Sequence, residues 1–411
     1  MRADAFWLNL AAVTQRHRKA IALVSALLEW YRKNARDLPW RGTRDPYAVW
    51  VSEIMLQQTQ VKTVLPYWNR WMAALPDIRA LARAKPERLR KLWEGLGYYT
   101  RVRNLQRAAQ TILSRHNGRF PEEFDAVLAL PGIGRYTAGA VCSIAFDQAK
   151  PILDGNVIRV LTRLFGIEGN PRDKETNARL WQLAEELVLQ AACEPSAADG
   201  PACSHFNQSL MELGALVCVP RDPRCEICPV VKCCAARRQN RVEQLPNLVR
   251  QPPATQRRFA AFVLSRDNRF LVRQRPAGGV NARLWEFPNL EITEADPEAK
   301  GVERRKGFRR SGSPANPGIS SPQTVAAWLP EALSSKENAS CGKDMAPTPM
   351  CVIKHSITRY RITLEVFRAS GVVRDDLAGR WLTLGQMRRL AFTGAHKRIL
   401  DQLPEADSNS G

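Results

Sequence analysis

Four closely spaced cysteines constrain this chain more than any other feature of its 411 residues. Cys218, Cys225, Cys228 and Cys234 stand in the spacing C-x6-C-x2-C-x5-C, directly after a long helical pattern. Thiolates suit both tetrahedral zinc and a [4Fe–4S] cube, so ligand type alone does not separate the two. Structural zinc sites typically use two short pairs separated by a longer segment, and the compact spacing here therefore favours the iron–sulfur cluster. Cys233, beside Cys234, is not expected to be a ligand.

The charge of the chain points to a polyanionic partner. Lys and Arg total 61 against 40 Asp and Glu, which gives a formal net charge of +21. Nucleic acid is the leading candidate, and an anionic membrane surface is the second. No apolar run approaches the length of a membrane span, and the start of the chain lacks an export signal. We therefore expect a cytoplasmic protein whose ten cysteines are mostly reduced.

The hydrophobic period divides the chain into two domains. Residues 20–235 are dominated by apolar residues three and four apart, which predicts a mainly α domain ending in the cysteine loop at 218–234. Residues 236–256 have the polar, basic and proline-bearing composition of a linker. Residues 257–404 change to strand-like alternation, which predicts an α+β domain. Inside it, residues 300–322 are rich in Gly, Pro, Ser and Arg and are expected to form a disordered insertion.

The stretch LPGIGRYTAG, residues 130–139, is typical of a helix-hairpin-helix turn. Gly132 and Gly134 permit a turn without side chains in the way. Backbone N–H groups at the start of the second helix could then approach a phosphate directly. Together with the net charge and the cysteine loop, the turn predicts binding to the DNA backbone.

The hairpin and the cysteine loop together resemble the endonuclease III superfamily of base-excision DNA glycosylases. Within that superfamily, four motifs are similar to the MutY-type adenine DNA glycosylases: LPWRGTRDPYAVWVSEIMLQQTQV (38–61), LWEGLGYYTRVRNL (92–105), PILDGNVIRV (151–160) and FNQSLMELGALVC (206–218). The resemblance implies a monofunctional, monomeric enzyme with a [4Fe–4S] cluster. Its expected substrate is double-stranded DNA with adenine opposite 8-oxoguanine or guanine.

Release of adenine requires two carboxyl groups with different duties, because the base must be protonated and the sugar becomes cationic. The resemblance makes Glu53 the general acid that protonates adenine at N7, and its apolar neighbours could raise the pKa of its carboxyl. The resemblance makes Asp154 the carboxylate that stabilises the sugar, with Asn156 holding it in place. Asp154 also opens a helix, and we expect the helix dipole to lower its pKa.

Tyr136 follows the hairpin at the position where strand-cutting members of the superfamily carry a lysine that forms a Schiff base. A phenol has no such amine, so strand cleavage by imine chemistry is not expected. The resemblance suggests that the hydroxyl of Tyr136 hydrogen-bonds Asp154.

Recognition of the mispair requires a base flipped out and its vacancy filled. Gln58 and Tyr98 match residues of the family that wedge into the duplex beside the opposite base. Trp40, Arg41 and Gln208 match positions that line the adenine pocket.

The second domain resembles the Nudix-like C-terminal domain of MutY enzymes. The acidic helix R-E-x-x-E-E-x-G that a Nudix hydrolase needs is missing between Glu286 and Trp328, so nucleotide hydrolysis is not expected. The domain should instead read the base opposite the adenine. The family pattern Phe-Ser-His is here Ile353-Lys354-His355, and His355 is the expected contact with 8-oxoguanine.

Two other functions fit parts of the sequence. One is a glycosylase with lyase activity on oxidised pyrimidines, which Tyr136 and the second domain argue against. The other is a DNA-binding or redox-sensing module that uses the cluster without base excision, which the intact motifs around Glu53 and Asp154 argue against.

Overall fold

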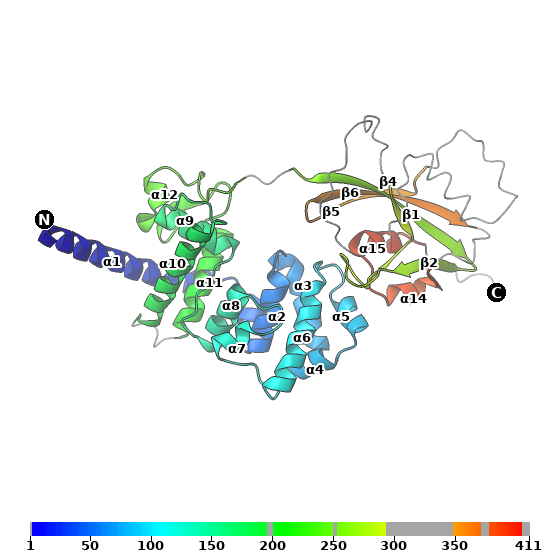
Figure 1. Cartoon of the computed structure of the whole chain (residues 1–411), viewed down its shortest axis with the longest axis horizontal. Coiled ribbons are helices and arrows are strands. Elements are labelled where there is room, and N and C mark those ends of the chain that lie inside the picture. The colour runs from blue at the N-terminus through cyan, green and yellow to red at the C-terminus, as the bar shows by residue number, and fades with distance from the viewer. Residues whose placement is uncertain (1, 195–199, 250–252, 293–347, 371–377, 405–411) are drawn as a thin grey trace, which may run out of the picture. The chain divides into compact units, whose positions relative to one another are not determined.

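The computed structural model describes residues 2–194, 200–249, 253–292, 348–370 and 378–404. The expected insertion at 300–322 lies outside these residues. The chain forms two compact units (Figure 1). Unit 1 consists of Met1–Ala84 and Thr100–Arg250, and unit 2 consists of Lys85–Tyr99 and Gln251–Gly411. The segment Lys85–Tyr99 lies between the two segments of unit 1 in the sequence but belongs to unit 2. The helical periodicity of the sequence did not suggest this assignment.

Unit 1 is helical, as predicted. Its helices are α1 (Arg2–Asn34), α2 (Pro46–Leu56), α3 (Val61–Ala74), α4 (Ile78–Arg83), α6 (Thr100–Arg115), α7 (Phe124–Leu128), α8 (Arg135–Phe146), α9 (Gly155–Phe165), α10 (Lys174–Ala192), α11 (Ala202–Leu216) and α12 (Ala235–Arg238), with 3-10 turns η1 (Pro39–Arg41), η3 (Cys225–Ile227) and η4 (Val231–Cys233). Helix α2 packs on α3 and α8, and α11 packs on α1, α8, α9 and α10. These contacts bring the segments around positions 53, 136, 154 and 212 into one core.

In its described residues, unit 2 combines helix α5 (Pro86–Leu92) with a mixed sheet and two further helices. The strands are β1 (Thr255–Arg266), β2 (Arg269–Gln274), β3 (Trp285–Glu286), β4 (Asn289–Ile292), β5 (Cys351–Ile357), β6 (Tyr360–Ser370) and β7 (Arg380–Leu382). The sheet order is β3-β2-β1-β6-β5, β4 also pairs with β1, and β7 pairs with β2. Helices α14 (Leu384–Arg388) and α15 (Gly394–Asp401) contribute to a core on one face. The α+β prediction is confirmed.

The local signals in unit 2 explain its strands. Asp267 and Asn268 both take positive φ between β1 and β2, which is the backbone of a two-residue hairpin turn. Alternate residues of β6, among them Leu364 and Val366, lie in the core that α15 covers. Phe367 lies in a second apolar cluster with Phe262. The sheet therefore buries apolar side chains on both of its faces.

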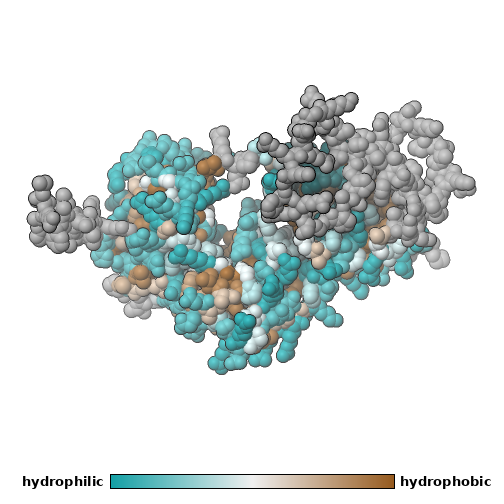
Figure 2. Space-filling view, viewed as in Figure 1, coloured by the Kyte–Doolittle hydropathy of each residue, from teal (hydrophilic) through white to brown (hydrophobic). Residues whose placement is uncertain are grey.

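On the face that Figure 2 shows, hydrophilic residues cover most of the described surface, and hydrophobic areas are small and scattered. Among the residues that the structure describes, no helix is long and apolar enough to cross a lipid bilayer.

Candidate active site and cysteine pocket

Glu53 lies on helix α2, most of whose residues are buried. Helix α2 begins after Asp45, whose side chain accepts a hydrogen bond from the N–H of Tyr47, and Pro46 occupies its first turn. The Glu53 side chain is only 6% exposed, among the buried residues of α2. Burial raises the pKa of Glu53 to about 7; a hydrogen bond from Tyr136 opposes this rise, and the charge of Asp154 adds to it. The apolar environment acts on this carboxyl as expected.

Tyr136 supports Glu53 directly. It lies in the first turn of α8, and its hydroxyl donates a hydrogen bond to Oε2 of Glu53 at 2.7 Å. The same hydroxyl lies 3.4 Å from Sδ of Met211. Burial and the charge of Glu53 hold the pKa of the phenol well above its usual value, so the hydroxyl stays a donor. The prediction that it hydrogen-bonds Asp154 was wrong, because α2 brings the other carboxyl within its reach.

Asp154 caps helix α9. Oδ1 accepts a hydrogen bond from the N–H of Val157 at 2.7 Å, and Oδ2 accepts one from Nδ2 of Asn156 at 3.0 Å. Burial raises the pKa of Asp154, and these hydrogen bonds reduce that rise without cancelling it. The prediction of a lowered pKa was wrong, because the desolvation of a mostly buried carboxylate outweighs the favourable helix terminus.

A hydrogen-bonded chain runs from Asp154 to the cysteine loop. Asn156 accepts at Oδ1 from Nη2 of Arg159 at 2.9 Å, and Nε of Arg159 donates to the carbonyl of Cys218 at 2.8 Å. Arg159 also donates to the carbonyl of Gly214 at 2.8 Å. A Cβ added at Gly214 would lie 2.7 Å from Cβ of Asn156, so glycine permits α11 to approach the start of α9. The sequence-based reasoning did not identify Arg159.

The residues expected to line the adenine pocket are held by buried contacts. Trp40 is 6% exposed, and its ring meets Trp68 edge-on with centroids 6.0 Å apart. Gln208 accepts a hydrogen bond from the hydroxyl of Tyr31 at 3.0 Å. Arg41 lies near enough for its charge to lower the pKa of Glu53.

Glu212, which the sequence-based reasoning missed, binds two arginines. Its carboxylate accepts hydrogen bonds from Arg36 at 2.7 Å and from Arg41 at 2.7 Å, and the residue is fully buried. Burial by itself would raise the pKa of Glu212, but the hydrogen bonds from both guanidinium groups bring it to about 2. Glu212 is the single carboxylate in the sequence of helix α11, and this was the available signal, since a buried carboxylate requires partners.

The two glycines of the hairpin have different reasons to be glycine. Gly132 has φ of +79°, and an added Cβ would lie 2.6 Å from the side chain of Asn104. Gly134, the residue before α8, has φ of −104°, and nothing in the described structure lies within 4 Å of an added Cβ. The chain itself therefore requires glycine at 132, whereas the space at 134 stays open for an approaching molecule.

The two expected wedge residues, Gln58 and Tyr98, are exposed and both have positive φ, +57° and +46°. Gln58 belongs to unit 1 and Tyr98 to unit 2. The end of α2 that precedes Gln58 is held by Arg101, whose Nη1 donates to the carbonyls of Ile54 and Gln57 at 2.8 and 2.7 Å. The sequence-based reasoning did not identify Arg101.

His355 lies on β5, at one edge of the sheet of unit 2. The preceding residues alternate, with Lys354 exposed and Ile353 buried in the core. Burial lowers the pKa of His355, the charge of Arg398 lowers it further, and a hydrogen bond with the backbone of Ile353 acts the other way. Its Nδ1 has no hydrogen-bond partner in the described part of the chain.

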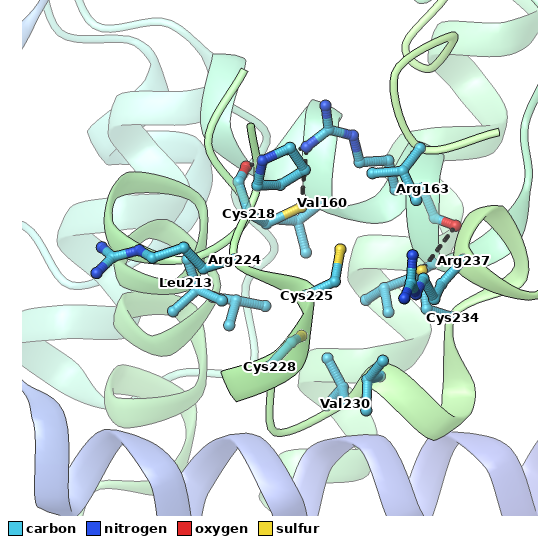
Figure 3. Close-up of a pocket in the computed structure, with 15 residues that line it drawn as sticks. Val160, Arg163, Leu213, Cys218, Arg224, Cys225, Cys228, Val230, Cys234 and Arg237 are labelled. Atoms are coloured by element: carbon cyan, nitrogen blue, oxygen red, sulfur yellow. Dashed lines mark hydrogen bonds between the residues drawn. The ribbon is translucent and has the colours of Figure 1, made fainter. Parts of the chain in front are cut away.

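The four expected cysteine ligands line one pocket, together with Val160, Leu213 and Val230 (Figure 3). Cys233 is not among the lining residues. Arg163, fully buried, donates to Sγ of Cys218 at 3.4 Å and to the carbonyl of Val219 at 2.8 Å. Its guanidinium thereby fixes the first cysteine of the loop.

The donor set of this pocket fits a thiolate-bound metal group. Burial raises the pKa values of Cys225, Cys228 and Cys234, that of Cys228 to about 12, and the neighbouring thiolates raise them further. A cationic group removes this penalty, because it binds the deprotonated thiols. In the described residues, no three His, Cys, Asp or Glu side chains are grouped as a site for a single metal ion.

Comparisons with known proteins agree with both units. The family model of the HhH-GPD superfamily base excision DNA repair protein matches residues 51–186, and the NUDIX domain model matches residues 260–402. Adenine DNA glycosylase of Rattus norvegicus is 39% identical over 426 residues, covering 91% of this chain and 76% of that protein. The adenine DNA glycosylase of Homo sapiens is 38% identical over 323 residues, covering 66% and 57% of the two chains. A solved thermostable thymine-DNA glycosylase is 31% identical, covers 54% of this chain and 98% of its own, and gives a TM-score of 0.48.

Proposed function

Because this chain belongs to the adenine DNA glycosylase family, we propose that it removes adenine paired with 8-oxoguanine or guanine in duplex DNA, with Glu53 as the acid and Asp154 as the ionised partner. The observation that carries this proposal is the Glu53–Tyr136 pair. A general acid works best when its pKa lies near the working pH, and burial brings that of Glu53 to about 7.

In the proposed reaction, the Glu53 carboxyl donates its proton to a ring nitrogen of adenine, which turns the base into a better leaving group. The bond between adenine and the sugar then breaks, and its electrons leave with the base. Water adds to the cationic sugar carbon and loses a proton to solvent, which gives the abasic site. Asp154 faces the resulting positive charge on the sugar. Asn156 and the N–H of Val157 hold the Asp154 carboxylate in one orientation.

Tyr136 keeps this chemistry at base removal. Its phenol donates a hydrogen bond to Glu53 where a lyase would present an amine. Without that amine the abasic strand stays intact, and a lyase acting on oxidised pyrimidines is the less suitable function.

We propose that Gln58 and Tyr98 are the wedge residues and that strand β5 carries the lesion reader. Gln58 and Tyr98 are exposed on loops with left-handed residues, a setting that suits insertion into a duplex. His355, on an edge strand, is the proposed contact with 8-oxoguanine. Lys354 is exposed beside it and adds a positive charge suited to a phosphate.

We also propose a [4Fe–4S] cluster in the cysteine pocket, with Cys218, Cys225, Cys228 and Cys234 as its ligands. The compact spacing and the apolar walls of one shared pocket support it. When bound, the cluster would tie the loop together through four sulfur ligands. Arg163 and Arg159 would connect that loop to helix α9. A monomeric state and a cytoplasmic location remain predictions.

The test uses purified protein and duplexes that carry one adenine opposite 8-oxoguanine, guanine or thymine. The strand is resolved before and after alkali. We expect base release opposite 8-oxoguanine and guanine, little opposite thymine, and strand breaks only after alkali. Excision restricted to an oxidised pyrimidine, with breaks before alkali, would favour the lyase instead.

A further inference from the structure

A pair of charged side chains joins the two pieces of unit 2. Oε1 of Glu94 accepts a hydrogen bond from the N–H of Phe392 at 2.7 Å. Nζ of Lys91 donates to the carbonyl of Leu390 at 2.9 Å, and it lies 2.6 Å from Oε2 of Glu94. The Glu94 side chain is 10% exposed and that of Lys91 32%. We refer to this pair and its two backbone partners as the Lys91–Glu94 clamp.

The side of the clamp contributed by the C-terminal piece is firmly held. Phe392 is fully buried, and its ring lies 5.9 Å from that of Phe287. Ala391 and Thr393, on either side of Phe392, both hydrogen-bond to the backbone of Trp285. The N–H of Trp285 donates to the carbonyl of Ala391 at 2.9 Å, and the carbonyl of Trp285 accepts from Thr393 at 3.0 Å. The clamp therefore grips a turn that belongs to the core of the sheet.

The other side of the clamp leads into the loop that carries Tyr98. Gly95, Gly97 and Tyr98 all have positive φ, at +103°, +71° and +46°. Within this run, the N–H of Gly95 donates to the hydroxyl of Tyr99 at 3.3 Å. Nε1 of Trp93 donates to the carbonyl of Gly97 at 3.0 Å, which closes the loop, and Glu94 directly follows Trp93. Tyr98 itself is 47% exposed.

The same core turn is connected to strand β5. The N–H of Phe287 donates to Nδ1 of His396 at 3.1 Å, which attaches α15 to the strand region beside Trp285. Nη1 of Arg398 on α15 donates to the carbonyl of Lys354 at 3.4 Å. Contacts within one compact unit thus lead from Glu94 to the residue beside His355.

We propose that Lys91 and Glu94 are positioning residues, through which the C-terminal piece holds the Tyr98 loop in fixed relation to strand β5. This inference rests on the proposed function. The aromatic wedge and the strand that reads the opposite base then engage the duplex together. Discrimination between 8-oxoguanine and guanine depends on this joint placement, although neither Lys91 nor Glu94 is required to touch DNA.

The test compares Glu94→Ala with wild type in single-turnover excision of adenine opposite 8-oxoguanine and opposite guanine. The ratio of interest is the rate constant opposite 8-oxoguanine divided by that opposite guanine. We expect this ratio to fall about tenfold, as the loss of one hydrogen bond to a charged group would produce. A second readout is the fluorescence of 2-aminopurine placed beside 8-oxoguanine, which reports ring insertion. Its response in Glu94→Ala should approach that of Tyr98→Ala. In both readouts, the double variant Glu94→Ala/Tyr98→Ala should lose no more than Tyr98→Ala alone.

The matched control is Glu87→Ala, which removes an ion pair with Arg90 of the same i,i+3 spacing from the same segment. It should leave both readouts unchanged. Glu94→Gln keeps an oxygen acceptor for the N–H of Phe392 and should recover part of the loss. If Glu94→Ala fails to fold by circular dichroism, Lys91→Met provides the same test by removing the donor to Leu390.

Two results would overturn the clamp. One is a Glu94→Ala variant that matches Glu87→Ala in both readouts, and the other is a double variant whose losses multiply. If wild type and Glu94→Ala distinguish 8-oxoguanine from guanine equally well, only the clamp is rejected. A wild type that excises adenine from neither duplex rejects the proposed function itself.

Discussion

The hydroxyl of Tyr136 donates a hydrogen bond to Oε2 of Glu53 at 2.7 Å, and this contact links the hairpin to a buried carboxyl on α2. The superfamily places a nucleophilic lysine at this position in its strand-cutting members. Here the phenol holds a carboxyl whose pKa is raised to about 7. In the proposed reaction, the residue at this position therefore supports protonation of the base and does not begin strand cleavage.

Tyr136→Phe should move the pH profile of base release. The hydrogen bond from Tyr136 lowers the pKa of Glu53, so its loss raises that pKa further. The fall in rate on the alkaline side should shift upward by about one pH unit. Single-turnover rates between pH 5 and 9 measure it. Tyr47 lies on α2 with Glu53, and its buried hydroxyl donates to the carbonyl of Leu75. Tyr47→Phe removes that hydroxyl and should leave the pH profile unchanged.

Glu53→Gln should stabilise the folded protein at alkaline pH. The pKa of Glu53 rises from 4.5 in the unfolded chain to about 7 in the folded one, so the folded state holds a proton that the unfolded state has lost between these values. Stability from this group therefore falls as pH rises from 4.5 to 7 and stays reduced above it. The cost is about 3 kcal/mol at most. Denaturant unfolding should show the variant more stable than wild type at pH 8 and equal at pH 4.5. Equal stability at both values would contradict the raised pKa.

Gly132→Ala and Gly134→Ala should separate folding from DNA binding. Gly132→Ala should cost about 1–3 kcal/mol of unfolding free energy, because of its positive φ and the close side chain of Asn104. Gly134→Ala should leave stability unchanged, since nothing in the described structure lies near the added methyl group. It should weaken duplex binding, measured by fluorescence anisotropy, if a phosphate approaches there. Unchanged binding by a stable Gly134→Ala would place the phosphate contact elsewhere.

Cys234→Ser should lose the metal group, whereas Cys233→Ser should retain it, because Cys234 lines the pocket and its neighbour Cys233 does not. Wild type and Cys233→Ser should contain about four iron and four sulfide per chain, as the cube requires. Metal analysis with a sulfide assay measures both. Stoichiometric zinc without sulfide in wild type would contradict the cluster, and equal iron in the two variants would contradict the ligand set.

The sequence is sufficient for features that neighbouring residues determine. The helical and α+β halves, the β1–β2 turn and the capping role of Asp154 all follow from local patterns, and the structure agrees with them. The partner of Tyr136 does not follow, because Glu53 lies 83 residues away in the sequence and only the packing of α2 on α8 brings it to the hydroxyl. The same holds for Glu212, whose arginine partners lie more than a hundred residues away.

The segment Lys85–Tyr99 marks another limit of sequence reasoning. Its helical period is the same whether it packs with unit 1 or with unit 2. Its assignment to unit 2 depends on side-chain contacts such as that between Glu94 and Phe392, nearly three hundred residues apart. Hydrophobic period predicts a helix, but it does not identify the core against which the helix packs.

If Glu53 donates the proton that releases adenine, its amide should bind DNA without releasing the base. Single-turnover excision from a duplex with one adenine opposite 8-oxoguanine compares wild type with Glu53→Gln at matched duplex binding. We expect the variant to bind the duplex as wild type does, because phosphate contacts dominate binding, and its base release to fall by at least about a thousandfold. Base release by Glu53→Gln within tenfold of wild type would show that another group donates the proton.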